Sequence, residues 1–97
     1  MRRRDNEQSL KDVLKQVVDL YRKDDKYRQA EVQIAWEEVI GTSIAKKTRS
    51  LYIRNKILTI SLDSGVLKEE LSFGREKIMK MMNENLGYHA VMKVEIK

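Results

Sequence analysis

The sequence contains no cysteine and no proline, and it has one histidine and one tryptophan among its 97 residues. Without cysteine it can form neither a disulfide framework nor a thiolate metal site, which fits a reducing compartment. No apolar run approaches the ~20 residues of a membrane span, and no apolar segment follows the basic N-terminus as it would in a secretory signal. The length predicts one domain with a single core.

Catalytic residue sets are missing as well. His89 has no metal-ligand spacing around it and no nucleophile with an orienting partner. The acidic pairs 24–25, 37–38 and 69–70 are adjacent residues, whose side chains point about 100° apart on a helix and cannot share a proton. There is no glycine-rich phosphate loop. We therefore predict a non-enzymatic protein without a metal, a cofactor or a small-molecule substrate.

Positive charge is concentrated in one stretch. No acidic residue occurs between Glu38 and Asp63, whereas five cations do: Lys46, Lys47, Arg49, Arg54 and Lys56. They equal the formal net charge of +5, so the other segments roughly cancel. Such a cluster favours phosphate contacts of low sequence specificity, and Tyr52 is placed to stack on a base. The alternative is that these cations only keep a hairpin soluble and protect its edge.

The N-terminal residues 1–8 form a second basic segment, with Arg2, Arg3 and Arg4 and nothing apolar after Met1. We expect a flexible tail here, followed by one domain over residues 9–97. A functional alternative is a basic arm that folds onto phosphates.

Two helices are predicted in the first half of the chain. Ser9 has the features of an N-cap, and the first helix should end near residues 22–23. Its buried face is predicted from the 3.6-residue period to be Leu10, Val13, Leu14, Val17 and Tyr21. The second helix, capped at residues 24–25, should run over 26–40 and end at Gly41. Its predicted apolar stripe is Tyr27, Ala30, Ile34, Ala35 and Val39, widened by Val32 and by Trp36 as a core aromatic.

A hairpin, a long helix and a last strand complete the chain. A two-residue turn at Asn55-Lys56 pairs Ile53 with Leu58, which puts the apolar side chains of both strands on one face. Residues 42–43 should cap a short turn before the hairpin. A helix capped by Asp63 or Ser64 should run to about Leu86, with Gly74 allowing close approach of another backbone. The strand 91–96 should point Met92, Val94 and Ile96 inward. The prediction is an α+β, KH-like order α-α-β-β-α-β, with the helices on one face of a three-stranded sheet.

A family resemblance rests on weakly specific positions spread over residues 8–97. They are Trp36, Val39, Gly41, Ile44, Ala45, Thr48, Leu58, Ser64, Leu67, Glu70, Leu71, Asn83 and Gly87. In this pattern the chain resembles the DciA family of bacterial replicative-helicase loaders. The GxxG loop of true KH domains is absent.

The resemblance implies a cytoplasmic adaptor that binds DNA, either single-stranded or duplex, and the replicative helicase DnaB during DNA replication. We predict the nucleic-acid-binding residues to be Lys46, Lys47, Arg49, Tyr52, Arg54 and Lys56, with Arg2, Arg3 and Arg4. The alternatives are a protein-binding module without nucleic-acid affinity and an RNA-binding KH-like protein.

Overall fold

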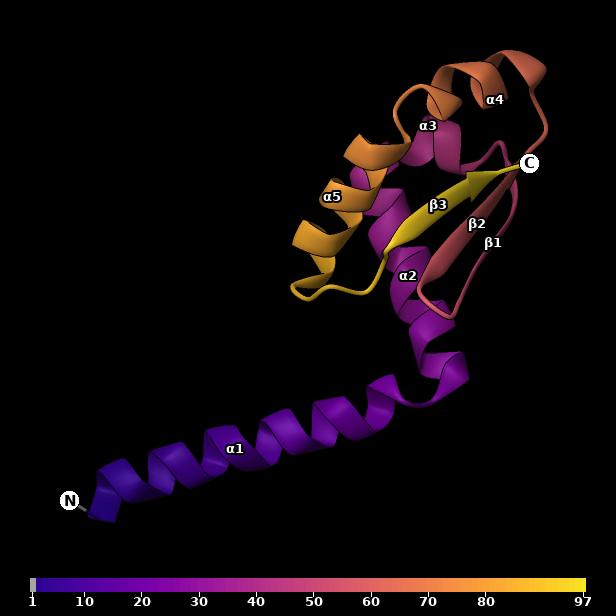
Figure 1. The fold of residues 1–97 in the computed structure, drawn as a ribbon. Helices are drawn as coiled ribbons and strands as arrows, with labels where there is room; N and C mark the ends of the chain where they lie inside the picture. Colours follow the sequence, from indigo (N-terminus) through magenta and orange to yellow (C-terminus); the bar gives the residue numbers. More distant parts are fainter. Residues whose placement is uncertain (1) are drawn as a thin grey trace.

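The computed structural model describes residues 2–97, and the side chains of residues 9–97 (Figure 1). The elements are α1 (Arg2–Arg22), α2 (Asp25–Ile40), α3 (Thr42–Ala45), β1 (Thr48–Arg54), β2 (Ile57–Leu62), α4 (Gly65–Ser72), α5 (Arg75–Leu86) and β3 (Lys93–Ile96). The sheet order is β1-β2-β3, with β1 antiparallel and β3 parallel to β2. The predicted α+β class and the order α-α-β-β-α-β are confirmed.

One face of the sheet carries the core. Helix α2 packs against β1, α5 packs against β3, and the two helices contact each other. Trp36 is only 2% exposed, and its indole N–H donates to the Thr48 hydroxyl at 3.0 Å. The predicted core role of Trp36 is therefore confirmed. The remaining buried hydrophobic residues are Val32, Ala35, Leu51, Ile53, Leu58, Ile60, Leu62, Ile78, Met82, Ala90, Val91 and Val94.

The hairpin has the predicted register. Leu51 pairs with Ile60 and Ile53 with Leu58. Asn55 and Lys56 both have positive φ, 52° and 63°, as a two-residue turn that matches the strand twist requires. Side chains alternate along a strand, so this register sends the apolar residues to the core and leaves the other face of the sheet for polar ones.

Two side-chain amides complete the backbone hydrogen bonding of the sheet. Gln29 on α2 accepts from Ile53 N–H at 2.9 Å and donates to Ile53 C=O at 2.6 Å, on the free edge of β1. Asn83 on α5 does the same for Val91, with distances of 2.8 and 2.9 Å. Because unpaired buried backbone groups are costly, these amides fix the edge strand and the entry to β3.

The predicted long helix is two helices, which corrects the sequence analysis. Helix α4 ends at Ser72, and Gly74 is the residue before α5. A Cβ built on Gly74 would meet only the Leu71 carbonyl oxygen at 3.9 Å, so no other backbone approaches it closely. The prediction that Met92 points inward is also wrong, because β3 begins at Lys93 and the Met92 side chain is exposed.

Two further cap assignments are wrong, and three are right. Helix α1 starts at Arg2, so Ser9 lies inside it, and α3 has no side-chain cap. Asp24 does cap α2, by accepting from the N–H groups of Lys26 and Tyr27. The side chain of Ser64 caps α4 by accepting from Leu67 N–H, and α2 ends at Gly41 as predicted. Whether residues 1–8 are flexible stays a prediction.

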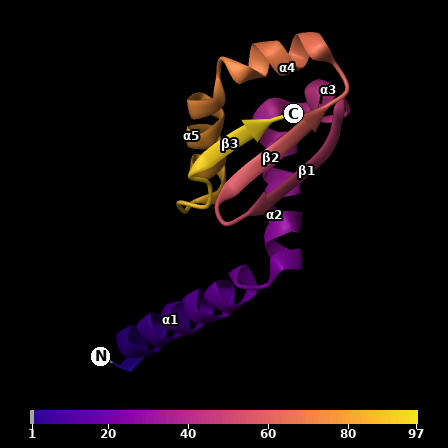
Figure 2. The same ribbon diagram turned by 45° about the vertical axis from the view of Figure 1, so that its right-hand side comes forward.

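The buried faces predicted for the first two helices are partly wrong. Helix α1 extends away from the rest of the domain (Figures 1 and 2), and its five predicted core residues are exposed. On α2, Ala35 is buried and Val39 partly buried, but Tyr27, Ala30 and Ile34 are exposed. The 3.6-residue period correctly identifies an apolar face on α1, but the rest of the domain does not bury that face.

Candidate nucleic-acid interface

The five predicted cations of the hairpin lie at its two ends. Lys46 and Lys47 precede β1, whereas Arg54 and Lys56 stand at the turn between β1 and β2. All of them are exposed. A seven-residue strand spans roughly 20 Å, so the structure places two separate basic clusters where the sequence predicted one stretch.

The first cluster, here the sheet-end cluster, comprises Lys46, Lys47, Arg49, Lys68 and Lys97. Its backbone is tied together where Asp63 N–H donates to Lys47 C=O at 3.0 Å. A hollow of about 380 Å³ is lined by Arg49, Lys68 and Lys97, together with Asp63 and neighbouring β2 and α4 residues. The side chains that line this hollow include three cations and one carboxylate, and this excess of positive charge favours binding of an anion.

Among the five predicted cations of the hairpin, Arg49 is the one that forms an ion pair in the described structure, with Asp63. The pairing of β1 with β2 shifts between Thr48 and Ser50, so Arg49 is the extra residue of an irregularity in the ladder. Its Nε lies 3.0 Å from Asp63 Oδ1, and both side chains are well exposed. Such a surface pair contributes about 0–1 kcal/mol, so Asp63 partly neutralises Arg49 without locking it in place.

The second cluster, here the tip cluster, comprises Arg54, Lys56 and Lys93. Lys56 C=O accepts from the N–H groups of Met92 and Lys93, at 2.8 and 3.3 Å, which brings the start of β3 to the hairpin turn. Arg54 pairs with Ile57, and Ile57 pairs with Lys93. Arg54 and Lys93 therefore flank Ile57 on the outer face of the sheet.

The outer face between the clusters contains Tyr52. Its side chain is 44% exposed, and it pairs across the strands with Thr59, which pairs with Glu95. Thr59 is buried between these longer neighbours. Figure 2 shows no described helix over this face of the sheet. An aromatic ring with cations beyond both ends of its strand is an arrangement that suits a base and its flanking phosphates.

A groove adjoins Tyr52 along the free edge of β1. It has a volume of about 640 Å³ and is lined by Asp25, Arg28 and Gln29 of α2 and by residues 51–55. Arg28 forms a 3.6 Å ion pair with Asp25, one turn away on the same helix. Since Gln29 already occupies the backbone groups of Ile53, a ligand in this groove would meet side chains rather than an open strand edge.

Sequence reasoning missed Lys68, Lys93 and Lys97 as members of these clusters. Alternation along the last strand, which predicts Val94 and Ile96 to point inward, also predicts an outward-facing Lys93 and extends to Lys97. Lys68 carries no local signal, because its position beside Arg49 depends on how α4 follows β2. The side chains of Arg2, Arg3 and Arg4 lie outside the described residues, and their role stays a prediction.

The described residues lack both a candidate membrane span and a candidate metal-binding cluster. No helix within residues 2–97 is long and apolar enough to cross a membrane. Among the residues whose side chains are described, no group of three or more His, Asp or Glu residues is arranged to hold a metal ion.

Nearly the whole chain matches the model of one known protein family. Residues 9–96 match the family model described as "Dna[CI] antecedent, DciA". The chain belongs to the DciA family. No curated protein matches the sequence. DciA membership supports a role of the DnaB-helicase-loader type, and DciA is a loader or adaptor family rather than a known enzyme family.

Proposed function

We propose that this DciA-family chain is a non-enzymatic cytoplasmic adaptor that binds single-stranded DNA and positions the replicative helicase DnaB on it. The family match over residues 9–96 carries the proposal. The two basic clusters support the DNA-binding part, because they border an uncovered sheet face with an exposed aromatic side chain between them. Phosphates would contact the clusters, and Tyr52 would stack on a base.

The proposed chemistry predicts strong salt dependence. Each phosphate contact on a single strand contributes about 0.7 to the slope of log K against log salt. A variant with Lys46→Glu and Arg54→Glu places one reversed charge in each cluster. We expect it to weaken binding of a fluorescent oligonucleotide at least tenfold at low salt and to reduce the salt slope. Tyr52→Ala should weaken binding with little change in that slope.

The matched control is Lys77→Glu with Lys80→Glu. Both residues are exposed on α5, away from the sheet, and the charge change equals that of the test variant. An equal loss of DNA affinity in both variants would show that the effect comes from net charge alone. Unchanged affinity in the cluster variant would refute the DNA-binding assignment, and tighter binding of RNA than DNA would redirect it to RNA.

The helicase contact needs a separate measurement. Tagged protein should retain DnaB from a bacterial lysate both with and without nuclease treatment. Loss of DnaB after nuclease treatment would mean that DNA alone bridges the two proteins, and the adaptor role would fail while DNA binding stood.

A further inference from the structure

Helix α1 carries an apolar stripe that the other described elements leave largely exposed; only at its C-terminal end does one member, Tyr21, pack against Tyr27 of α2, with ring centroids 5.6 Å apart. Its members are exposed by 40–65%, and they are Leu10, Val13, Leu14, Val17, Leu20 and Tyr21. At 100° per residue they fall within about 120° of the helix circumference. Val18 and Arg22, the half-buried residues of the described part of this helix, lie on a different side. Apart from Tyr21, the stripe is therefore separate from the side that meets the domain.

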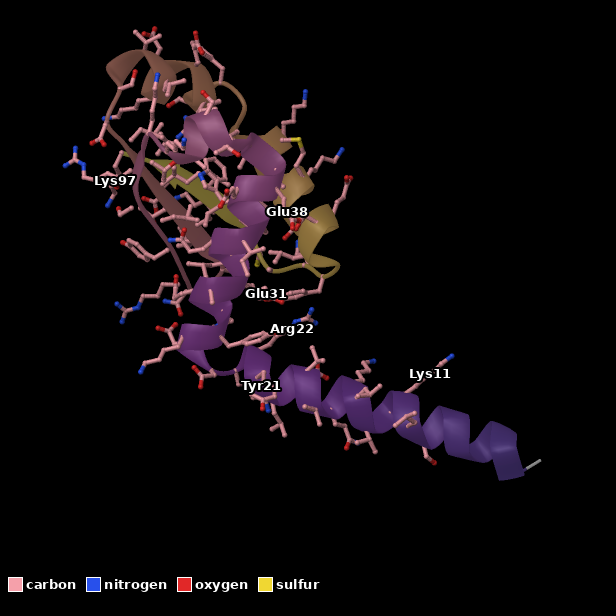
Figure 3. All side chains as sticks on the ribbon, turned by 180° about the vertical axis from the view of Figure 1, so that it is seen from behind. Lys11, Tyr21, Arg22, Glu31, Glu38 and Lys97 are labelled. Carbon is pink, nitrogen blue, oxygen red and sulfur yellow. The ribbon has the colours of Figure 1, made fainter. Side chains whose placement is uncertain are left out.

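The junction between α1 and α2 holds this helix away from the core. The Arg22 guanidinium stacks over the Tyr88 ring at 3.7 Å, and its Nε lies 3.6 Å from Glu31 Oε2. The Tyr88 hydroxyl donates a hydrogen bond to Glu31 Oε1 at 2.7 Å. Figure 3 shows Arg22 and Glu31 at the bend, with Lys11 far out along α1. These contacts fix the last turn of α1 and leave the stripe unable to reach the sheet or α5.

We propose that a second copy of this chain covers the stripe, through an antiparallel pair of α1 helices. Residues 10, 13, 17 and 20 follow the alternating three- and four-residue spacing of a helix-pairing seam. In an antiparallel pair Leu10 faces Leu20 of the other copy, and Val13 faces Val17. Every layer then joins side chains of equal size, so the stripe is complementary to itself.

The charges of α1 agree with this pairing. The positions that flank the stripe on its other side are Ser9 and Gln16, which are uncharged. Between residues 9 and 21 the charged residues gather on the opposite side of the helix, and they are Lys11, Asp12, Lys15 and Asp19. An interface centred on the stripe would therefore desolvate no charged side chain among residues 9–21, and antiparallel helix dipoles attract each other.

The area is sufficient for a specific but weak dimer. With about half of each of six large apolar side chains exposed on each copy, full pairing would remove on the order of 1,200 Å² from water, near the lower limit for stable interfaces. An isolated helix of this length is marginal in water, so packing of the stripe would also stabilise the helix. We expect dissociation in the micromolar range.

Sedimentation equilibrium of the whole chain, from about 1 to 100 µM, tests the proposal across that range. The mass should rise from one chain to two. Val13→Glu with Val17→Glu should raise the dissociation constant at least tenfold, because pairing would bury carboxylates. Lys11→Gln with Lys15→Gln is the control, since it lowers the net charge by the same two units on the opposite side of the helix and should dimerise normally.

Two readouts keep the outcome interpretable. Fluorescence of the buried Trp36 shows whether the domain of each variant is folded, because this residue lies in the core and not on α1. The chain has no cysteine, so a chain carrying Val13→Cys should form a disulfide with one carrying Val17→Cys more readily than either forms with itself. A wild-type chain that stays monomeric over the whole range, or a stripe variant that dimerises unchanged, would overturn the proposal.

Discussion

Replacing Asn83 by alanine should be among the most destabilising polar substitutions in this protein. The Asn83 amide bonds both the N–H and the C=O of Val91, which is completely buried. The substitution would leave two buried backbone groups unpaired, at about 1–3 kcal/mol each. Allowing for partial relaxation, we expect a loss of about 2–4 kcal/mol from a total of about 5–15 kcal/mol. The loss should be this large because Val91 leads into β3, and its anchoring holds the parallel strand in the sheet.

Urea unfolding followed by Trp36 fluorescence measures this loss. With a denaturant slope of about 2 kcal/mol per molar, the middle of the usual range for small proteins, the midpoint should fall by about 1–2 M. Asn85→Ala is the matched control, because Asn85 lies on the same helix but is exposed and bonds only Glu38, at 2.9 Å. We expect it to cost less than about 0.5 kcal/mol. Equal midpoints for the two variants would refute the reasoning that the paired amide bonds to Val91 carry the effect.

Three further predictions concern backbone and side-chain contacts. Gln29→Ala should cost about 1–3 kcal/mol in urea unfolding, because Ile53 loses both partners on the strand edge; a change below 0.5 kcal/mol would contradict it. Gly41 has φ 90° and ψ 157°, so Gly41→Ala should lower the free energy of unfolding by about 1–3 kcal/mol, whereas Gly74→Ala, at φ −113°, should change it by no more than about 1 kcal/mol in thermal melts. A larger loss for Gly74→Ala than for Gly41→Ala would refute the argument from backbone strain. Burial and the hydrogen bond to Glu31 raise the pKa of Tyr88 to about 12 from 10.0. The neutral phenol therefore favours the folded state, and stability should fall as pH rises from about 10 to 12 and fall less in Tyr88→Phe, as followed by melting temperature; identical pH profiles would contradict this.

The hairpin was predictable because its information is local. Two apolar alternations joined by a two-residue turn allow one register that places Leu51, Ile53, Leu58 and Ile60 on the same face. A slip by one residue would turn the whole apolar set towards solvent. The sequence alone therefore predicts the strand pairing, whereas the positive φ of Lys56, a poor residue for that turn position, is shown only by the structure.

The helix errors have a different origin. Periodicity identifies an apolar face but contains no information on what covers it, so Val13 and Val17 resemble core residues although nothing in the domain reaches them. The break at Gly74 was hidden because Leu71 and Ile78 are seven residues apart, which is two turns of an uninterrupted helix. The helices on both sides of the break contribute to one core, and the apolar pattern alone does not show the interruption.

The candidate site was predictable only in part. Lys46 and Arg54 could be assigned to exposed positions flanking a strand, since loops and turns lie at the surface. The grouping of Lys68 and Lys97 with Arg49 follows from the crossover through α4 and from the parallel pairing of β3. Neither is encoded within a short window of sequence. Tertiary structure therefore redistributes one sequence cluster into two surface clusters.

The two proposed surfaces lie on different parts of the molecule, which bears on how they would work together. The basic clusters belong to the sheet, whereas the stripe lies on α1, which the Arg22–Glu31–Tyr88 contacts hold away from the core. An antiparallel pair of α1 helices would place the two sheets at opposite ends of the assembly, with both sets of clusters free. If both sheet faces bind DNA as proposed, two weak faces linked in this way would act on a long strand with an effective concentration that neither has alone. A short strand can engage only one face, so pairing through α1 would increase affinity for long single strands without changing any contact between a sheet and DNA.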